Sequence, residues 1–192
     1  DDALRNKLRS VAKENNGTLE VGGEFTSFSQ KPNLTPDWFH DGKLGGVTYH
    51  LSRGHIREDL YRYLFASCFA VVHGRSPKMG DFPEALLPEH KNVREAVKGE
   101  MFSDRFRVQV EGKPSTTVTS HISKDGHYFI HPDPTQCRSL TVREAARLQT
   151  FPDNYFFEGP RTMQYHQIGK RGGPLLAQQI AKVIYDVFRQ HR

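Results

Sequence analysis

The stretch Arg138–Asp153 reads RSLTVREAARLQTFPD and gives the chain its clearest local structure. Thr141 and Glu144 have the spacing of a capping box, in which a hydroxyl and a carboxylate each bind a backbone amide at the first turn of a helix. The proline of Phe151-Pro152-Asp153 ends the helical pattern. The sequence therefore predicts a short, well-capped helix over residues 142–149.

Three arginines, Arg138, Arg143 and Arg147, surround the start of this predicted helix. A helix N-terminus with free amides and nearby arginines can bind a phosphate group. The same arginines can instead be solvated or pair with Glu144 and Asp153. The sequence leaves both interpretations open, and it places Arg138 and Arg143 among the candidate phosphate ligands.

The composition favours a polyanionic partner. The chain has 192 residues, a formal net charge of +5 and a pI near 9.2. No run approaches the roughly 20 apolar residues that a membrane span needs, and the first residues form no apolar signal core. We therefore expect a cytoplasmic protein without a membrane partner. The chain begins without a methionine, which is consistent with a processed or truncated product.

Cys68 and Cys137 are the only cysteines, and neither belongs to a Cys-x-x-Cys pair. Two thiols fit a reducing compartment as easily as one disulfide. Cys68 lies among aromatic residues in the sequence and is expected to be a small core residue. The histidines His121, His127 and His131 fit no zinc spacing, so we expect no metal.

Hydrophobic periodicity divides the chain into a strand-rich first part and a helical last part. Helices are expected over residues 1–16, from Ile56 to His73 with Gly74 as the stop, and from Pro174 to Gln190. Alternating or β-branched runs predict strands at residues 18–21, 24–27, 47–51, 106–110, 116–122 and 128–130. The Asp-Gly pair within residues 124–127 is a hairpin signal between the last two strands.

Three segments resemble the DNA cytosine-5 methyltransferases, in the order that the family has them. Leu140–Asp153 is similar to the ninth family motif nearly letter for letter. Gln164–Gly169, followed by Pro174–Ala177, resembles the tenth motif. Pro114–Thr119 resembles the Thr-rich end of the target recognition domain. The chain therefore looks like the C-terminal part of such an enzyme.

The resemblance implies an α+β fold. Residues 1–137 would form a small mixed target recognition domain with β-hairpins and a long helix. Residues 138–192 would supply C-terminal helices that complete a Rossmann-like methyltransferase domain. The implied reaction is methyl transfer from S-adenosylmethionine to C5 of cytosine in double-stranded DNA, within a bacterial restriction–modification system and close to the nucleoid.

The segments that carry out the chemistry in this family do not occur in the sequence. The family's nucleophile is a thiolate from a Pro-Cys loop, whereas Ser67 precedes Cys68 and Gln136 precedes Cys137 here. The Glu-Asn-Val that holds the cytosine ring and the Phe-x-Gly-x-Gly cofactor loop are missing as well. We therefore expect no catalytic residue in this chain and no activity of the chain alone.

Three arrangements are compatible with a sequence that lacks these segments. The catalytic part can lie in an N-terminal region of the same polypeptide, or in a separate chain that acts as a partner. The alternative is a stand-alone, non-catalytic DNA-binding module.

The resemblance also implies roles for individual residues. It makes four residues of the Thr-rich segment face DNA, namely Thr116, Thr117, Thr119 and Ser120. It places Gly169 and Lys170 beside the cofactor. The family usually continues this glycine with Asn-Ala-Val-Pro-Pro, whereas this chain continues with Lys170-Arg171-Gly172-Gly173-Pro174. The change fits a basic, flexible turn that faces phosphate, or a segment no longer used for catalysis.

Two more clusters are candidate DNA contacts. Arg53 and Arg57 lie at the start of the long predicted helix, where positive charge opposes the helix dipole and an anionic partner would relieve the conflict. In the alternative interpretation, the neighbouring acidic residues Glu58 and Asp59 already offset that charge. His121 and Lys124 lie at the predicted hairpin and could contact a groove edge or phosphates.

Overall fold

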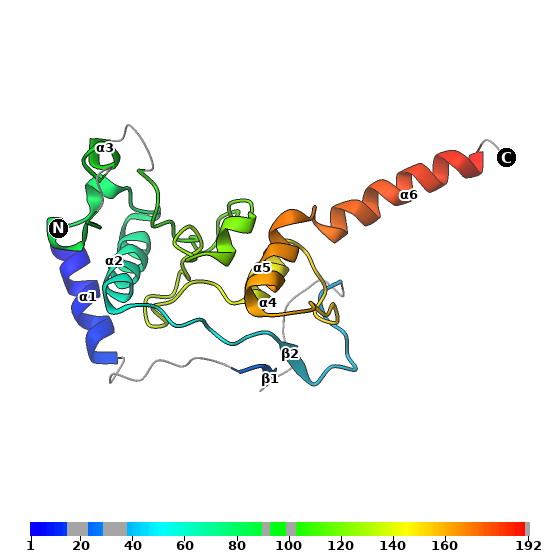
Figure 1. The fold of residues 1–192 in the computed structure, drawn as a ribbon, viewed down its shortest axis with the longest axis horizontal. Coiled ribbons are helices and arrows are strands. Elements are labelled where there is room, and N and C mark those ends of the chain that lie inside the picture. The colour runs from blue at the N-terminus through cyan, green and yellow to red at the C-terminus, as the bar shows by residue number, and fades with distance from the viewer. Residues whose placement is uncertain (15–22, 29–37, 90–92, 99–102, 191–192) are drawn as a thin grey trace. The chain divides into compact units, whose positions relative to one another are not determined.

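The structure is a computed structural model that describes residues 1–14, 23–28, 38–89, 93–98 and 103–190 (Figure 1). Backbone contacts divide the chain into two compact units, each built from separate stretches. The first unit comprises Asp1–Gly22, Ser52–Thr116 and Lys124–Leu140, and the second comprises Gly23–Leu51, Thr117–Ser123 and Thr141–Arg192. The predicted division into residues 1–137 and 138–192 refers to domains of a complete enzyme, which these units do not test. It stays a prediction.

The long helix of the first unit is α2, which spans Arg57–His73. Gly74 ends it in the left-handed conformation (φ 63°), and the Gly74 amide donates to the carbonyl oxygen of Ala70 (2.9 Å). Glycine adopts this conformation at little cost, which explains why the helix ends here. The predicted long helix is confirmed. Helix α1 (Asp2–Glu14) packs on α2 and confirms the predicted N-terminal helix.

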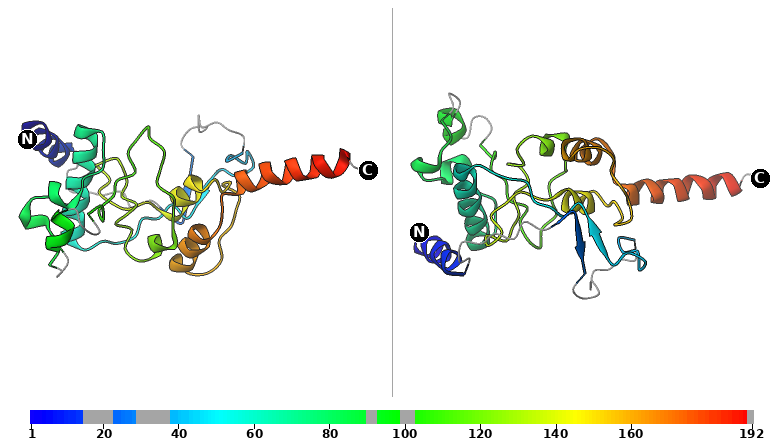
Figure 2. Two further views of the ribbon diagram at one scale, coloured as in Figure 1. Left: turned by 90° about the horizontal axis from the view of Figure 1, so that it is seen from above. Right: turned by 60° about the horizontal axis from the view of Figure 1, so that its bottom comes forward.

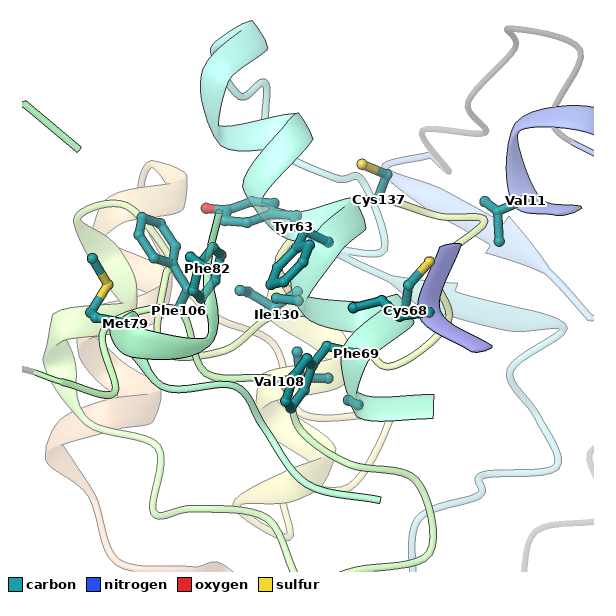
Figure 3. Close-up of a cluster of buried hydrophobic side chains, with 14 residues drawn as sticks. Val11, Tyr63, Cys68, Phe69, Met79, Phe82, Phe106, Val108, Ile130 and Cys137 are labelled. Carbon is teal, nitrogen blue, oxygen red and sulfur yellow. The ribbon is translucent and has the colours of Figure 1, made fainter. Parts of the chain in front are cut away.

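The core of the first unit gathers around α2 (Figure 3). Tyr63 and Cys68 of this helix are fully buried, and α1 adds Val11. The remaining elements of the unit are the 3-10 helices η1 (Met79–Asp81) and η2 (Glu84–Leu86) and helix α3 (Val93–Lys98). Irregular segments also bury large side chains, namely Phe106, Val108 and Ile130. Each such side chain contributes about 1.5–3 kcal/mol when it leaves water, so these segments are held without a sheet.

Residues 106–110 and 128–130 do not form the predicted strands. Val108 and Ile130 make an isolated parallel bridge, and Ile130 and Ser139 make an isolated antiparallel one. The pairing ends because the chain turns away after Val110: the Lys113 amide donates to the Val110 carbonyl oxygen (3.2 Å). Pro114 follows and has no amide with which to continue a ladder.

The strand predicted over residues 116–122 is also wrong, because side chains take its backbone partners. The Thr116 amide donates to Oε1 of Gln109 (3.0 Å), and the Val118 carbonyl oxygen accepts from Nε2 of Gln149 (2.9 Å). Residues Ser120–Ser123 then form the 3-10 helix η3. The predicted hairpin at residues 124–127 is consequently a turn without paired strands.

The second unit contains a small antiparallel sheet of β1 (Phe25–Ser27) and β2 (Gly46–Thr48), visible in Figure 2. A Cβ on Gly46 would lie 2.2 Å from the carbonyl oxygen of Thr26, so the pairing requires glycine there. The sheet confirms the predicted strands at residues 24–27 and 47–51, although β2 ends early because Tyr49 adopts a positive φ of 63°. The strand predicted at residues 18–21 lies outside the described residues.

Three helices complete the second unit: α4 (Val142–Leu148), α5 (Arg161–Lys170) and α6 (Pro174–Gln190). Helices α4 and α6 were predicted, whereas α5 was not, because it buries only Tyr165 and Ile168 and has a glycine in its last turn. Every residue of α6 from Leu176 onward is exposed, including large apolar side chains. The mixture of helices with a small sheet is consistent with the expected α+β class.

Candidate functional site

The capping box predicted for α4 is confirmed. The Thr141 hydroxyl accepts from the Glu144 amide (3.2 Å), and the Glu144 carboxylate accepts from the Thr141 amide (2.8 Å). The Arg143 amide donates to the carbonyl oxygen of Tyr49 (3.1 Å). These first-turn amides therefore have partners within the protein, which argues against a phosphate at this helix start.

Arg143 is buried, with 1% of its surface exposed. Its guanidinium donates to the carbonyl oxygens of Thr48 (3.1 Å), Pro152 (3.1 Å) and Tyr155 (3.0 Å). It also lies over the Tyr49 ring, 5.5 Å from the ring centre. A side chain with these contacts has no exposed face for a phosphate. This arginine joins β2 to the loop after α4. Its burial argues against the expected DNA contact, which stays a prediction.

The other two arginines of the motif are also paired within the protein. Arg147 donates from Nε and Nη2 to the two carboxylate oxygens of Asp153 (2.8 and 2.6 Å), which is the bidentate geometry that an arginine favours. Arg138 is 7% exposed and donates to the Gln136 side chain (2.9 Å) and the Ser139 carbonyl oxygen (3.1 Å). Its burial argues against the expected phosphate contact as well.

The Thr-rich segment meets the tenth-motif segment inside the second unit. Helix η3 packs on α5, and a Cβ on Gly169 would lie 2.4 Å from the Ser120 nitrogen and 2.4 Å from the Thr119 carbonyl carbon. The Ser123 hydroxyl lies 3.2 Å from Nε2 of His166 on α5. The Cα of Gly169 is therefore covered by protein backbone, and this contact explains why the position is a glycine.

Several predicted DNA contacts lie at the surface of this same unit. Thr117, Thr119 and His121 are exposed, and Ser120 is half-buried. Lys170 is exposed at the C-terminal end of α5, directly after Gly169. The hydroxyl and imidazole groups of the Thr-rich segment and the Lys170 ammonium group thus lie on two segments that pack together.

The turn from Lys170 to Gly173 is fixed at its second glycine. A Cβ on Gly173 would lie 2.8 Å from the Thr150 hydroxyl, and that hydroxyl accepts from the Leu175 amide at the start of α6 (3.2 Å). A Cβ on Gly172 would meet nothing within 4 Å. The turn is therefore anchored to the end of α4, in contrast to the flexible turn that the two glycines predicted.

The remaining predicted DNA contacts belong to the first unit. Lys124 is exposed in its turn, and Arg57 is exposed at the start of α2. Arg57 donates from Nε to the Tyr61 hydroxyl (2.8 Å) and lies over that ring. Arg53 is half-buried and donates to the Lys124 carbonyl oxygen (3.3 Å). Thr116 is half-buried because Gln109 accepts from both its amide and its hydroxyl.

Both cysteines are free and buried. Cys68 lies in the core of the first unit, and burial raises the pKa of its thiol to about 11. Burial also raises the pKa of Cys137 to about 11, and its sulfur donates to the Leu60 carbonyl oxygen (2.9 Å). Figure 3 shows both cysteines with other members of this buried cluster. A reactive cysteine needs an accessible, stabilised thiolate, and both sites favour the neutral thiol.

The sequence did not predict the burial of two histidines of the first unit, His55, which is half-buried, and His127, which is buried. Nε2 of His55 accepts from the Ser139 amide (3.3 Å), and burial lowers the pKa of His55 to about 4. Nδ1 of His127 lies 2.8 Å from the Tyr63 hydroxyl, and burial lowers the pKa of His127 as well. No sequence signal could have paired His55 with Ser139, because 84 positions separate them.

In the part of the chain that the structure describes, no three His, Cys, Asp or Glu side chains gather as a metal site requires. Among the same residues, no helix is both long enough and apolar enough to cross a membrane.

Similarity to known proteins bears on this geometry. The type II methyltransferase M.Bpa9945I of Bacillus paralicheniformis is 49% identical over 146 residues, which cover 76% of this chain and 31% of the relative. The DNA (cytosine-5-)-methyltransferase M.ApeKI of Aeropyrum pernix is 37% identical over 97% of this chain and 45% of the relative. The type II methyltransferase M1.HphI of Haemophilus parahaemolyticus is 40% identical over 54% of this chain and 24% of the relative. The chain thus spans less than half the length of these relatives.

A family model covers most of the chain. Residues 57–186 match the model described as C-5 cytosine-specific DNA methylase. The matched range includes α2 of the first unit as well as η3, α4, α5 and most of α6 in the second. This chain belongs to the C-5 cytosine-specific DNA methylase family.

Proposed function

We propose that this chain is the C-terminal, target-recognition portion of a type II DNA cytosine-5 methyltransferase, which binds double-stranded DNA but supplies no nucleophile. One observation carries the proposal. From Thr141 onward, the segments similar to the ninth and tenth motifs are folded in one compact unit, whereas the only two thiols of the chain are buried in the other. The relatives M.Bpa9945I and M.ApeKI are more than twice as long as their aligned parts, which leaves room for a catalytic part elsewhere.

The proposed DNA contacts come from both units. In the first unit, the exposed cations Arg57 and Lys124 neutralise phosphates. In the second unit, Lys170 does the same beside Thr117, Thr119 and His121, whose short polar side chains suit contacts to the sugar–phosphate backbone or to base edges. Arg138 and Arg143 are left out because they are buried.

The family transfers a methyl group from S-adenosylmethionine, but the residues of this chain do not fit a cofactor site. Gly169 is only partly exposed, and the Thr119–Ser120 backbone occupies the side on which a Cβ would lie. Lys170 is exposed at the end of α5. In the proposed function, S-adenosylmethionine is therefore bound by the part of the enzyme that carries the catalytic motifs.

Helix α6 is the proposed contact with that catalytic part. Leu176, Ile180, Val183 and Val187 follow one another at intervals of four, three and four residues, and all are about half exposed or more. Such a stripe normally packs on a core. We assign its partner as a Rossmann-like methyltransferase domain, either from an N-terminal region of the same polypeptide or from a separate chain. An exposed stripe of this kind does not suit a stand-alone DNA-binding module.

An assay with tritiated S-adenosylmethionine and mixed DNA tests the missing nucleophile. We expect the purified chain to incorporate no label, and measurable incorporation would overturn the proposal. Adding a polypeptide that carries the catalytic motifs of a relative such as M.ApeKI should give label above that of either part alone. Val183→Glu should abolish this gain without changing the melting temperature of the chain, because the side chain is exposed. Gln179→Glu, on an exposed polar position of the same helix, is the matched control.

DNA binding by the chain itself is tested by its dependence on salt. Each phosphate that the chain neutralises should add about 0.9 to the negative slope of the logarithm of the association constant against the logarithm of the salt concentration. Lys124→Ala and Lys170→Ala should each reduce the magnitude of this slope by about 0.9, the contribution of one phosphate. A flat salt response of the wild-type chain would contradict the proposed DNA contacts.

A further inference from the structure

The turn that carries Lys124 is held tightly within the first unit. Gly126 has a positive φ of 79°, and a Cβ on it would lie 2.6 Å from the Cβ of Ser139. The Asp125 carboxylate accepts from the His127 amide (3.0 Å), which closes the turn locally. The place from which the Lys124 side chain extends thus depends on the side chains that contact this turn.

Two side chains, one from α2 and one from just before it, donate hydrogen bonds to the backbone of the turn. Nη1 of Arg53 donates to the Lys124 carbonyl oxygen (3.3 Å), and the Tyr63 hydroxyl donates to the Asp125 carbonyl oxygen (3.3 Å). The guanidinium carbon of Arg53 also lies 3.9 Å from the point that a Cβ on Gly126 would occupy. The Arg53 guanidinium therefore lies beside the turn and donates one hydrogen bond to its backbone.

We propose that Arg53 is a positioning residue for the DNA contact of Lys124, and that Arg53 is not itself a phosphate ligand. The inference rests on the proposed function, because it takes the contact between Lys124 and a phosphate from there. Arg53 is half-buried and turned to a peptide carbonyl, whereas Lys124 and Arg57 are exposed. Fixing the turn lowers the conformational entropy that Lys124 loses when it binds DNA.

A double-mutant cycle on DNA affinity separates positioning from direct contact. Arg53→Ala should weaken binding of the full chain to duplex DNA by a factor close to that of Lys124→Ala, about threefold at moderate salt for one phosphate contact. In the Lys124→Ala background, Arg53→Ala should have little further effect, because nothing is left to position. Additive losses, or no loss from Arg53→Ala alone, would overturn the inference.

Arg57→Ala is the matched control for this cycle. Arg57 is an exposed arginine near Arg53 in sequence, and it is proposed to contact its own phosphate. Its loss should therefore add to that of Lys124→Ala. Arg53→Lys keeps a donor for the Lys124 carbonyl oxygen and should restore part of the affinity, which a general loss of folding would not allow. If the wild-type chain shows no salt-dependent DNA binding, the proposed function fails. A second measurement, which needs no DNA, then still decides whether Arg53 holds the turn.

This second measurement is the rate of proteolytic cleavage at the turn in the absence of DNA. The endoproteinase Lys-C cleaves after lysine, and a turn held in place resists it because cleavage requires local opening. Arg53→Ala should raise the cleavage rate after Lys124 severalfold relative to the rate after the exposed Lys43, which lies in the other unit. Arg53→Lys should bring the rate back toward that of the wild type. Equal rates in the wild type and Arg53→Ala would show that Arg53 does not hold the turn and would overturn the inference.

Discussion

A methyl group on Gly169 would lie 2.4 Å from the carbonyl carbon of Thr119, so helix α5 and the Thr-rich segment meet with no space between them. The segment similar to the tenth motif therefore packs directly against the segment proposed to face DNA. Any shift of α5 would move Thr119 and its exposed neighbours. This contact makes the arrangement of the proposed DNA-facing residues sensitive to a single methyl group.

Gly169→Ala should destabilise the second unit. Alanine favours a helix over glycine by about 1 kcal/mol, but overpacking against backbone costs about 1–3 kcal/mol or more, and here the clash is with backbone that cannot rotate away. We expect a net loss of about 1–2 kcal/mol in the free energy of unfolding. Urea unfolding followed by Trp38 fluorescence measures it, since the Trp38 indole donates to Thr150 in this unit (2.8 Å). Gly172→Ala, where a Cβ meets nothing within 4 Å, should leave stability unchanged and serves as the control.

Arg143→Lys should destabilise the same unit without a specific effect on DNA contacts. Lysine keeps the charge but cannot reach the carbonyl oxygens of Thr48, Pro152 and Tyr155 together, so buried acceptors lose their donors. We expect a loss of about 3 kcal/mol, again from urea unfolding followed by Trp38. Arg171→Lys, at an exposed position, should change stability by less than about 0.5 kcal/mol. A stable Arg143→Lys variant with a smaller salt slope of DNA binding would restore the phosphate interpretation.

The sequence predicted those elements whose signals are local. Thr141 and Glu144 define the start of α4, and Gly74 defines the end of α2, because each signal acts within a few residues of the backbone it satisfies. The amphipathic pattern of α6 is equally local. In these places the sequence and the structure agree to within a residue or two.

The predictions that were wrong depend on partners far along the chain. Residues 116–122 have the composition of a strand, but the Gln149 side chain, 31 positions away, binds the Val118 carbonyl oxygen. In the same way, the sequence does not indicate that the Arg143 guanidinium donates to the carbonyl oxygen of Thr48, 95 positions away. Periodicity describes which positions are apolar, and it does not specify which distant polar group will satisfy a given backbone atom.

Both thiols should be unreactive in the folded chain. Burial raises the pKa of Cys68 and of Cys137 to about 11, so almost no thiolate is present at pH 8, and neither sulfur is accessible. With 5,5′-dithiobis(2-nitrobenzoate) at pH 8, we expect no rapid release of thionitrobenzoate from the native chain and stoichiometric release in guanidinium chloride. Rapid modification of either native cysteine would contradict the proposal that the chain holds no nucleophile.

The stability of the first unit should fall as the pH is lowered from about 6.5 to about 4. Burial lowers the pKa of His55 to about 4 and also lowers the pKa of His127, so the unfolded chain takes up these protons first. The histidine contribution is complete above the ordinary pKa of 6.5 and is lost as the pH falls toward 4; for His55 we expect about 2 kcal/mol, allowing for its partial exposure. The Asp81 carboxyl, whose pKa is lowered by its hydrogen bonds with Arg75, loses its contribution only at more acidic pH.

The buried thiols provide the measurement for this pH effect, because both lie in the first unit and react only when it opens. Labelling with 4,4′-dithiodipyridine, which also reacts at acidic pH, gives the free energy of opening at each pH. His55→Gln keeps a side-chain acceptor for the Ser139 amide but does not titrate, so its stability should change less between pH 6.5 and 4 than that of the wild type. Parallel pH curves for the two proteins would mean that His55 is not held neutral by its surroundings, and the dependence would then have to come from His127 alone.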